Sequence, residues 1–123
     1  MKQGSNLVLG KKGEEIAVSY LREKGYKICE TNFYTHWGEI DIVAEEDNSL
    51  VFVEVKTRYG TDYGYPEEAV NFYKIRTLER AANWYLLEKE IKEGLYRIDV
   101  VSIILGENDK VLNIKLFKNI TVD

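Results

Sequence analysis

A strongly hydrophobic run near the middle of the chain carries two charges. Residues 50–56 read Leu-Val-Phe-Val-Glu-Val-Lys, and this run of β-branched and aromatic side chains predicts a buried strand. Successive side chains of a strand point to opposite faces, so Glu54 and Lys56 share a face with Phe52. Because burying ions is costly, the pair indicates an active site. The alternative is a structural pair on the wet face of an edge strand.

The hydrophobic pattern also predicts two helices. An apolar stripe with helical spacing covers residues 11–24, and Gly25 is expected to end that helix. Pro66, followed by two glutamates, marks the start of a longer helix, because proline suits a first turn and acids suit its dipole. This second helix is expected to run toward Glu93 and to stop at Gly94.

Short apolar runs predict five strands. Polar residues 45–49 connect two of them as a hairpin, while residues 57–65, rich in glycine and tyrosine, lack periodicity and are expected to form a loop. The predicted strands cover residues 27–33, 38–44, 50–56, 96–105 and 111–117.

The resulting order, α-β-β-β-α-β-β, is typical of an α/β fold in which helices flank a mixed sheet. The 123 residues, 45% of them hydrophobic, suffice for one core and one domain. Residues 1–10 precede the first predicted helix and are expected to be a flexible N-terminus.

Composition narrows the class of protein. No apolar stretch is long enough to span a bilayer, and the first six residues lack the order of a secretion signal, so we expect a cytoplasmic protein without a membrane partner. Cys29 is the sole cysteine, which excludes an internal disulfide and a thiolate metal site within one chain.

A second acid lies in the strand that precedes the charged run. Asp41 is flanked by isoleucines within residues 38–44, and the hairpin is expected to bring it beside Glu54. Carboxylates and main-chain carbonyls are ligands that Mg²⁺ and Mn²⁺ prefer. Asp41, Glu54 and the backbone carbonyl of Val55 are therefore candidate metal ligands, and Lys56 is a candidate to orient water and stabilise transition-state charge.

The arrangement of Asp41, Glu54 and Lys56 resembles the PD-(D/E)xK nuclease motif, with Ile40 in place of the proline. The surrounding residues are more specific and run from about residue 10 to residue 101. In order, they are Gly13-Glu14-Glu15-Ile16-Ala17, Tyr20-Leu21, Gly25-Tyr26, Asn32, Gly38-Glu39-Ile40-Asp41, residues 51–58, Gly64, Pro66-Glu67 and residues 97–101. Together they resemble the bacterial YraN family of predicted endonucleases, which is similar to the archaeal Holliday-junction resolvases.

This resemblance implies a restriction-endonuclease-like fold and a metal-dependent endodeoxyribonuclease. It implies action on branched DNA or on recombination and repair intermediates, by a homodimer whose two-fold symmetry would match a junction. It also adds Glu14 as a fourth catalytic and metal-binding acid. The alternative for Glu14 is a carboxylate favoured by a helix dipole.

The overall charge opposes nucleic-acid binding. The chain carries a net charge of −4 with a sequence pI near 5.1, whereas phosphate binding usually relies on a basic face. Four residues are candidates for DNA contact: Arg58, Lys74, Lys12 and Tyr63, the last as a ring on which bases stack. The alternative for each residue is a solvated side chain or one that holds its loop. For the whole protein, the alternative function is a non-catalytic nucleic-acid- or protein-binding module on a nuclease fold.

Three other polar residues could have a structural or surface role instead of a role in the site. Glu39 shares a strand face with Asp41 and is either an outer ligand or a rim carboxylate. Asp99, in an apolar strand, is interpreted as a structural partner, for example of Arg97. His36, the sole histidine, is interpreted as a surface residue.

Overall fold

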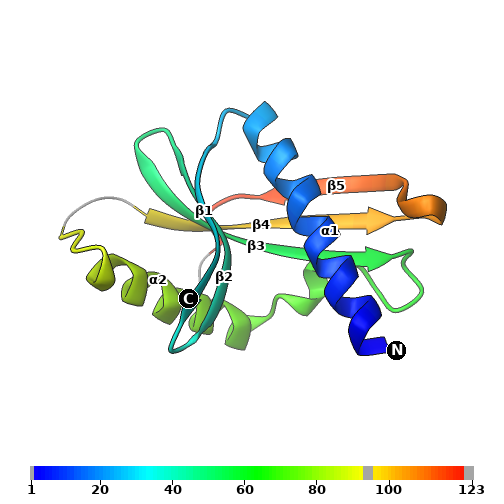
Figure 1. Cartoon of the computed structure of the whole chain (residues 1–123), viewed down its shortest axis with the longest axis horizontal. Coiled ribbons are helices and arrows are strands. Elements are labelled where there is room, and N and C mark those ends of the chain that lie inside the picture. The colour runs from blue at the N-terminus through cyan, green and yellow to red at the C-terminus, as the bar shows by residue number, and fades with distance from the viewer. Residues whose placement is uncertain (1, 93–95, 121–123) are drawn as a thin grey trace.

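A five-stranded mixed sheet forms the centre of the molecule (Figure 1). The computed structural model describes residues 2–92 and 96–120. The strands lie side by side in chain order, and β3 pairs with β4 in parallel while the other neighbours are antiparallel. They are β1 (Lys27–Thr35), β2 (Gly38–Glu46), β3 (Ser49–Tyr59), β4 (Tyr96–Leu105) and β5 (Val111–Phe117).

Two helices cover the two faces of this sheet. Helix α1 (Lys2–Glu23) packs mainly over β3, and α2 (Phe72–Glu88) packs mainly over β2 on the opposite face. The predicted order of helices and strands, and the mixed α/β class, are thereby confirmed. No helix among the described residues has the length and apolarity needed to cross a membrane.

Alternation along β3 divides its side chains between two hydrophobic cores. Val51 and Val53 pack with Leu21 of α1, whereas Phe52 packs with Leu78 of α2. Each core is built from apolar side chains that alternate along the strands, because neighbouring residues of a strand face opposite sides. The predicted split of this run between two faces is therefore confirmed.

Helix α1 begins earlier than predicted. The expected flexible segment, residues 1–10, is helical from Lys2 onward, and the helix does not start at Lys11. Leu9 packs against the core on the α1 side of the sheet. The apolar stripe thus begins two residues before the predicted start of the helix, and tertiary packing of this kind is what stabilises most helices.

The segment after the charged run also differs from the prediction. Residues 57–59, expected to belong to a loop, continue β3, because pairing with β4 extends as far as Tyr59 opposite Leu105. The loop begins at Gly60, which adopts a positive φ of 63°, a backbone conformation that glycine tolerates best. Strand β1 likewise ends at Thr35, two residues beyond the predicted end.

The long helix predicted from Pro66 is interrupted and shorter. Residues Pro66–Ala69 form a 3₁₀ turn, and α2 starts at Phe72, where the Asn71 side chain accepts a hydrogen bond from the Lys74 backbone N–H at 3.0 Å. This cap satisfies an otherwise unpaired N–H group. The helix ends at Glu88, and the predicted stop at Gly94, like Glu93, lies outside the described residues.

Candidate active site

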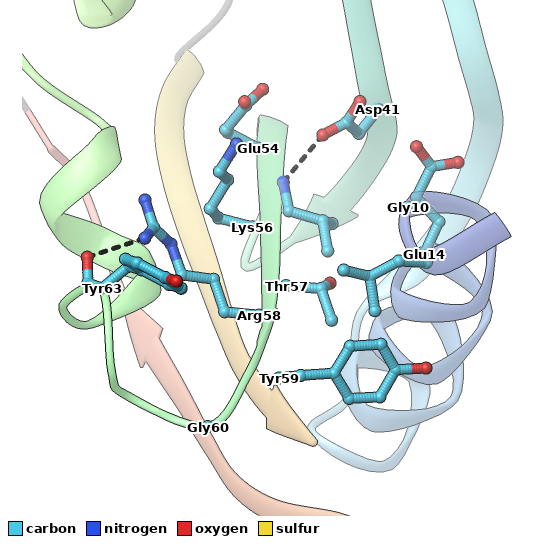
Figure 2. A pocket seen from close by; sticks show the side chains of 12 residues that line it. Gly10, Glu14, Asp41, Glu54, Lys56, Thr57, Arg58, Tyr59, Gly60 and Tyr63 are labelled. Atoms are coloured by element: carbon cyan, nitrogen blue, oxygen red, sulfur yellow. Dashed lines mark hydrogen bonds between the residues drawn. The ribbon is translucent and has the colours of Figure 1, made fainter. Parts of the chain in front are cut away.

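The candidate site lies where β2 separates from β3. Their pairing runs from Glu46 opposite Ser49 to Ile42 opposite Val53 and goes no further, while β2 continues to pair with β1. Just beyond this point, Asp41 Oδ2 accepts a hydrogen bond from the Val55 backbone N–H at 2.8 Å (Figure 2). The carboxylate therefore takes the place of a main-chain acceptor, and the separated strands leave an opening.

A pocket of about 640 Å³ occupies this opening. It contains all four residues predicted to be catalytic, contributed by α1, β2 and β3. In Figure 2, Glu54 and Lys56 extend from one side of β3, while Asp41 and Glu14 approach from the other side. Its lining is Leu9, Gly10, Glu14, Asp41, Glu54, Val55, Lys56, Thr57, Arg58, Tyr59, Gly60 and Tyr63.

Three carboxylates meet at the α1 side of the pocket. Glu14, Glu39 and Asp41 each place one oxygen atom within 4.8 Å of the others. The amide nitrogen of Asn32 donates to Glu14 Oε1 at 2.7 Å and to Glu39 Oε2 at 2.9 Å. One side chain of β1 thus holds an acid of the helix against an acid of the sheet.

Glu54 approaches from the α2 side and is incompletely satisfied. The residue is 7% exposed, and its Oε2 atom lies 3.4 Å from the Lys74 ammonium. Its other oxygen, Oε1, is buried and has no hydrogen-bond partner among the residues that the structure describes. A buried acceptor without a donor is costly, so the described part of the fold does not by itself satisfy this carboxylate.

Burial and mutual repulsion raise the pKa values of these acids. Burial, then the charge of Glu54, raise the pKa of Asp41 to about 8, against the opposing effect of the Val55 N–H. Burial also raises the pKa of Glu54, although the positive charges of Lys74 and Lys56 act against it. The pKa of Glu14 rises through burial as well, while its hydrogen bond from Asn32 lowers it. The cluster is therefore short of positive charge, and functional sites often have this property.

Gly13 allows α1 to come close enough to β3 for Glu14 to reach the pocket. A Cβ atom at this position would overlap the hydroxyl of Thr57. The Thr57 side chain is buried, and close packing leaves a buried side chain little room to move. Glycine at the step before Glu14 thus fixes the distance between helix and strand.

Comparison with known proteins assigns the chain to a family. Residues 13–103 match the model of the uncharacterised protein family UPF0102. The chain belongs to this family. The matched residues of this UPF0102 chain include Glu14, Asp41, Glu54 and Lys56, and the resemblance to the YraN family is confirmed as far as family membership goes.

Relatives from several bacteria cover almost the whole UPF0102 chain. A UPF0102 protein of Caldicellulosiruptor saccharolyticus is 45% identical over 111 residues, which are 90% of this chain and 94% of the relative. One from Syntrophomonas wolfei is 49% identical over 108 residues, 88% and 94% of the two chains. One from Persephonella marina is 44% identical over 108 residues, 88% and 90% of the two chains. These names give family membership and state no activity.

The four predicted DNA-contact residues of this UPF0102 protein separate into two groups. Arg58 and Tyr63 line the pocket, where the Arg58 guanidinium donates to the Tyr63 carbonyl at 2.8 Å and the Tyr63 side chain is 91% exposed. Lys74 instead pairs with Glu54, and Lys12 pairs with Asp109, and neither lines the pocket.

The structural interpretations of the remaining polar residues hold. Asp99 is fully buried and forms an ion pair with Arg97 at 3.0 Å, which confirms its role as a structural partner. His36 is exposed at the turn between β1 and β2, as expected for a surface residue. Asn32 is among the residues that carry the family resemblance, but the sequence analysis gave it no role in the site, because a polar, poor strand former inside a strand-like run was its only local signal.

Proposed function

We propose that this protein is a divalent-metal-dependent endonuclease that hydrolyses DNA phosphodiester bonds. The observation that carries the proposal is the convergence of Glu14, Asp41, Glu54 and Lys56 on one pocket. These residues come from a helix and two strands, so no local structural requirement brings them together. Three acids and one lysine around an open pocket suit the hydrolysis of an anionic ester.

The acids fit a bound Mg²⁺ or Mn²⁺. Asp41, Glu54 and the backbone carbonyl of Val55 would hold the ion, with Glu14 as a further ligand, because hard divalent cations prefer oxygen donors. The unsatisfied Glu54 Oε1 and the raised pKa of Asp41 support this fit. When bound, such an ion neutralises phosphate charge and lowers the pKa of coordinated water.

Lys56 supplies the fixed positive charge of the pocket. It lies on the Glu54 side of β3 and lines the cavity (Figure 2). A compact ammonium group in this position would orient the attacking water and stabilise the negative charge that grows on the phosphate. The 2.8 Å hydrogen bond from the Val55 N–H to Asp41 Oδ2 holds the acid against β3.

The substrate and assembly follow from the resemblance to resolvase-like nucleases. We propose branched DNA, such as a recombination or repair intermediate, as the substrate. We also propose a homodimer that presents two pockets to two strands. Arg58 and the exposed Tyr63 ring at the pocket support contact with a phosphate and an unstacked base. A cytoplasmic location suits such a substrate.

A cleavage assay with matched variants tests the proposal. Four-way, flap, single-stranded and duplex DNA are incubated with the protein in Mn²⁺ or in EDTA. We expect cleavage in Mn²⁺ alone, and we expect Asp41→Asn and Lys56→Ala to reduce it by about a hundredfold or more. The controls are Asp47→Asn and Lys110→Ala, which make the same chemical changes at exposed positions.

Equal cleavage by the Lys56→Ala variant and the wild type would overturn the assignment. The chain's net charge of −4 favours a second candidate, a non-catalytic binding module on the same fold. Binding of DNA or of a protein without turnover in any divalent cation would establish that candidate instead.

A further inference from the structure

The exposed side of α2 carries a line of aromatic and arginine side chains. Phe72, Arg76, Arg80 and Trp84 follow one another at intervals of four residues, so they lie on one face of the helix. All four are exposed, Phe72 at 50% and Trp84 at 39%. The line spans about 18 Å at the usual helical rise.

The turn between β1 and β2 adds two further rings to this line. His36 stacks on Trp84, with ring centroids 5.7 Å apart and planes inclined by 19°, and it meets Trp37 edge to face at 5.2 Å. Trp37 is 43% exposed. We call the six residues His36, Trp37, Phe72, Arg76, Arg80 and Trp84 the α2 stripe.

Both arginines of the α2 stripe lie over aromatic faces. The Arg80 guanidinium is 4.9 Å from the centre of the Trp37 ring, and the Arg76 guanidinium is 5.5 Å from the centre of the Phe72 ring. Such contacts hold a cation in place without neutralising it. The rings thus orient two positive charges toward solvent.

These two charges have no acidic partner among residues 2–92 and 96–120. Neither Arg76 nor Arg80 forms an ion pair there. Glu79 lies between them on α2 but forms no ion pair with either arginine in the described part of the chain. In a chain of net charge −4, the α2 stripe is therefore a local positive surface.

The α2 stripe begins beside the candidate site. Phe72 is the first residue of α2, and Lys74 in the same turn pairs with Glu54. From there the helix leads away from the turn Pro66–Ala69 (Figure 1). Lys74 lies on the side of α2 that faces the sheet, whereas the stripe lies on the exposed side. A chain of nucleotides that leaves the pocket and passes around the start of α2 would therefore meet the stripe along its length.

We propose that the α2 stripe binds a single-stranded segment of nucleic acid that extends from the candidate site. The inference rests on the proposed nuclease function and adds the structural class of the substrate. Guanidinium groups bind phosphates, and aromatic faces stack on bases without regard to sequence. A paired duplex hides its base faces, so it would use only the two charges. A site that combines rings and charges thus selects a strand with unpaired bases.

Both tryptophans of the chain lie in the α2 stripe, which gives a direct optical test. The chain contains two tryptophans, and they are Trp37 and Trp84. A single-stranded oligothymidylate is titrated into the full chain in EDTA, which prevents cleavage, and tryptophan fluorescence is followed. We expect saturable quenching, and weaker quenching with a duplex of equal length.

Charge and stacking are then separated by substitution. The double variant Arg76→Gln, Arg80→Gln should bind the oligonucleotide about tenfold more weakly. The slope of log affinity against log salt should fall by about 1.4, since each lost phosphate contact on a single strand contributes about 0.7. Trp84→Leu should weaken binding about fivefold through lost stacking. The matched control is Arg22→Gln, an exposed arginine near the end of α1, which should change nothing, and circular dichroism confirms folding of each variant.

The outcomes separate this inference from the nuclease assignment. If wild-type protein cleaves DNA while the α2 stripe variants bind and quench as it does, the inference fails and the nuclease stands. If no DNA is cleaved but the double variant loses single-strand binding, the inference stands without the activity. Self-association of the wild type that Trp84→Leu abolishes, measured by sedimentation in the same samples, would assign the surface to protein contact and overturn the inference.

Discussion

Two buried acids on neighbouring strands have opposite surroundings. Asp99 of β4 lies beside Val53, and Glu54 of β3 lies beside Val100, so the acids are adjacent in the register. Asp99 accepts hydrogen bonds from the Tyr26 hydroxyl at 2.6 Å, the Arg97 Nε at 3.0 Å and the Asn119 backbone N–H at 2.9 Å. Both oxygen atoms of the Asp99 carboxylate therefore accept hydrogen bonds from groups of the protein.

The candidate site leaves its acids short of donors. Within the described ranges 2–92 and 96–120, Glu54 Oε1 has no hydrogen-bond partner, and Asp41 accepts one hydrogen bond, from a backbone N–H. Glu14, Glu39 and Glu54 add negative charge around Asp41. Buried charges that serve structure alone are normally paired. The comparison indicates that burial alone does not distinguish a structural carboxylate from one suited to bind a ligand. The distinguishing property is whether hydrogen-bond donors of the protein reach all of its oxygen atoms.

The sharpest contrast comes from neutralising one acid of each region. Asp99→Asn should lower the free energy of unfolding by about 2–3 kcal/mol, because a neutral amide weakens the hydrogen bonds that this buried carboxylate accepts, although Arg97 keeps Glu46 as an acidic partner. Asp41→Asn should leave stability unchanged or raise it at pH 8, because it removes a repelled charge and keeps an acceptor for Val55. Urea unfolding in EDTA measures both. Equal losses in the two variants would contradict the comparison.

Stability of the metal-free protein should fall as pH rises. The pKa of Asp41 is about 8 in the folded chain and near its ordinary value of 3.8 when unfolded. Between these pH values the folded state binds more protons than the unfolded state, so the free energy of unfolding decreases by on the order of 1 kcal/mol per pH unit. Urea unfolding at pH 5 to 8 in EDTA should show this slope in the wild type and a shallower one in Asp41→Asn. If the unfolding free energies of the wild type and of Asp41→Asn changed with pH in parallel, this expectation would be wrong.

A smaller effect on stability is expected from the close approach of Gly13 to Thr57, which lets Glu14 reach the pocket. Gly13→Ala should cost about 2 kcal/mol, because the added methyl group overlaps Thr57 and pushes α1 away from β3. Gly10→Ala is the matched control, since none of the described atoms lies within 4 Å of a Cβ there, and alanine should stabilise that helix by roughly 0.5–1 kcal/mol. Thermal unfolding compares the two. A stabilised Gly13→Ala variant would show that the close approach is not required.

Most of the fold could be predicted because its signals are local. The strands 96–105 and 111–117 match β4 and β5 residue for residue, since apolar runs bounded by turn residues define them. The end of β3 could not be predicted, because Thr57, Arg58 and Tyr59 carry no apolar alternation and are strand only through pairing with β4. The early start of α1 likewise depends on the packing of Leu9.

The features of the candidate site likewise fall into those that the sequence could predict and those that it could not. Asp41, Glu54 and Lys56 could be predicted because acids and a lysine inside apolar strands stand out locally. The contact of Lys74 with Glu54 could not, because it joins α2 to β3 across the sheet face and has no signal in either segment. The role of Asn32, quoted above only as a resemblance residue, could not be predicted for the same reason, as its two acceptors lie on α1 and β2.

Asn32 therefore offers the subtlest test of the site. Its backbone φ of 53° suits glycine, so Asn32→Gly removes the amide bridge between Glu14 and Glu39 without backbone strain. Groups that orient metal ligands typically cost about tenfold or more in metal affinity when removed. We expect Asn32→Gly to weaken Mn²⁺ binding about tenfold in calorimetric titration. Asn48→Gly is the matched control, because it makes the same change at another asparagine of positive φ, 64°, in the β2–β3 turn. Loss of affinity in both variants, or in neither, would remove Asn32 from the site and leave its amide as a simple link between two surface acids.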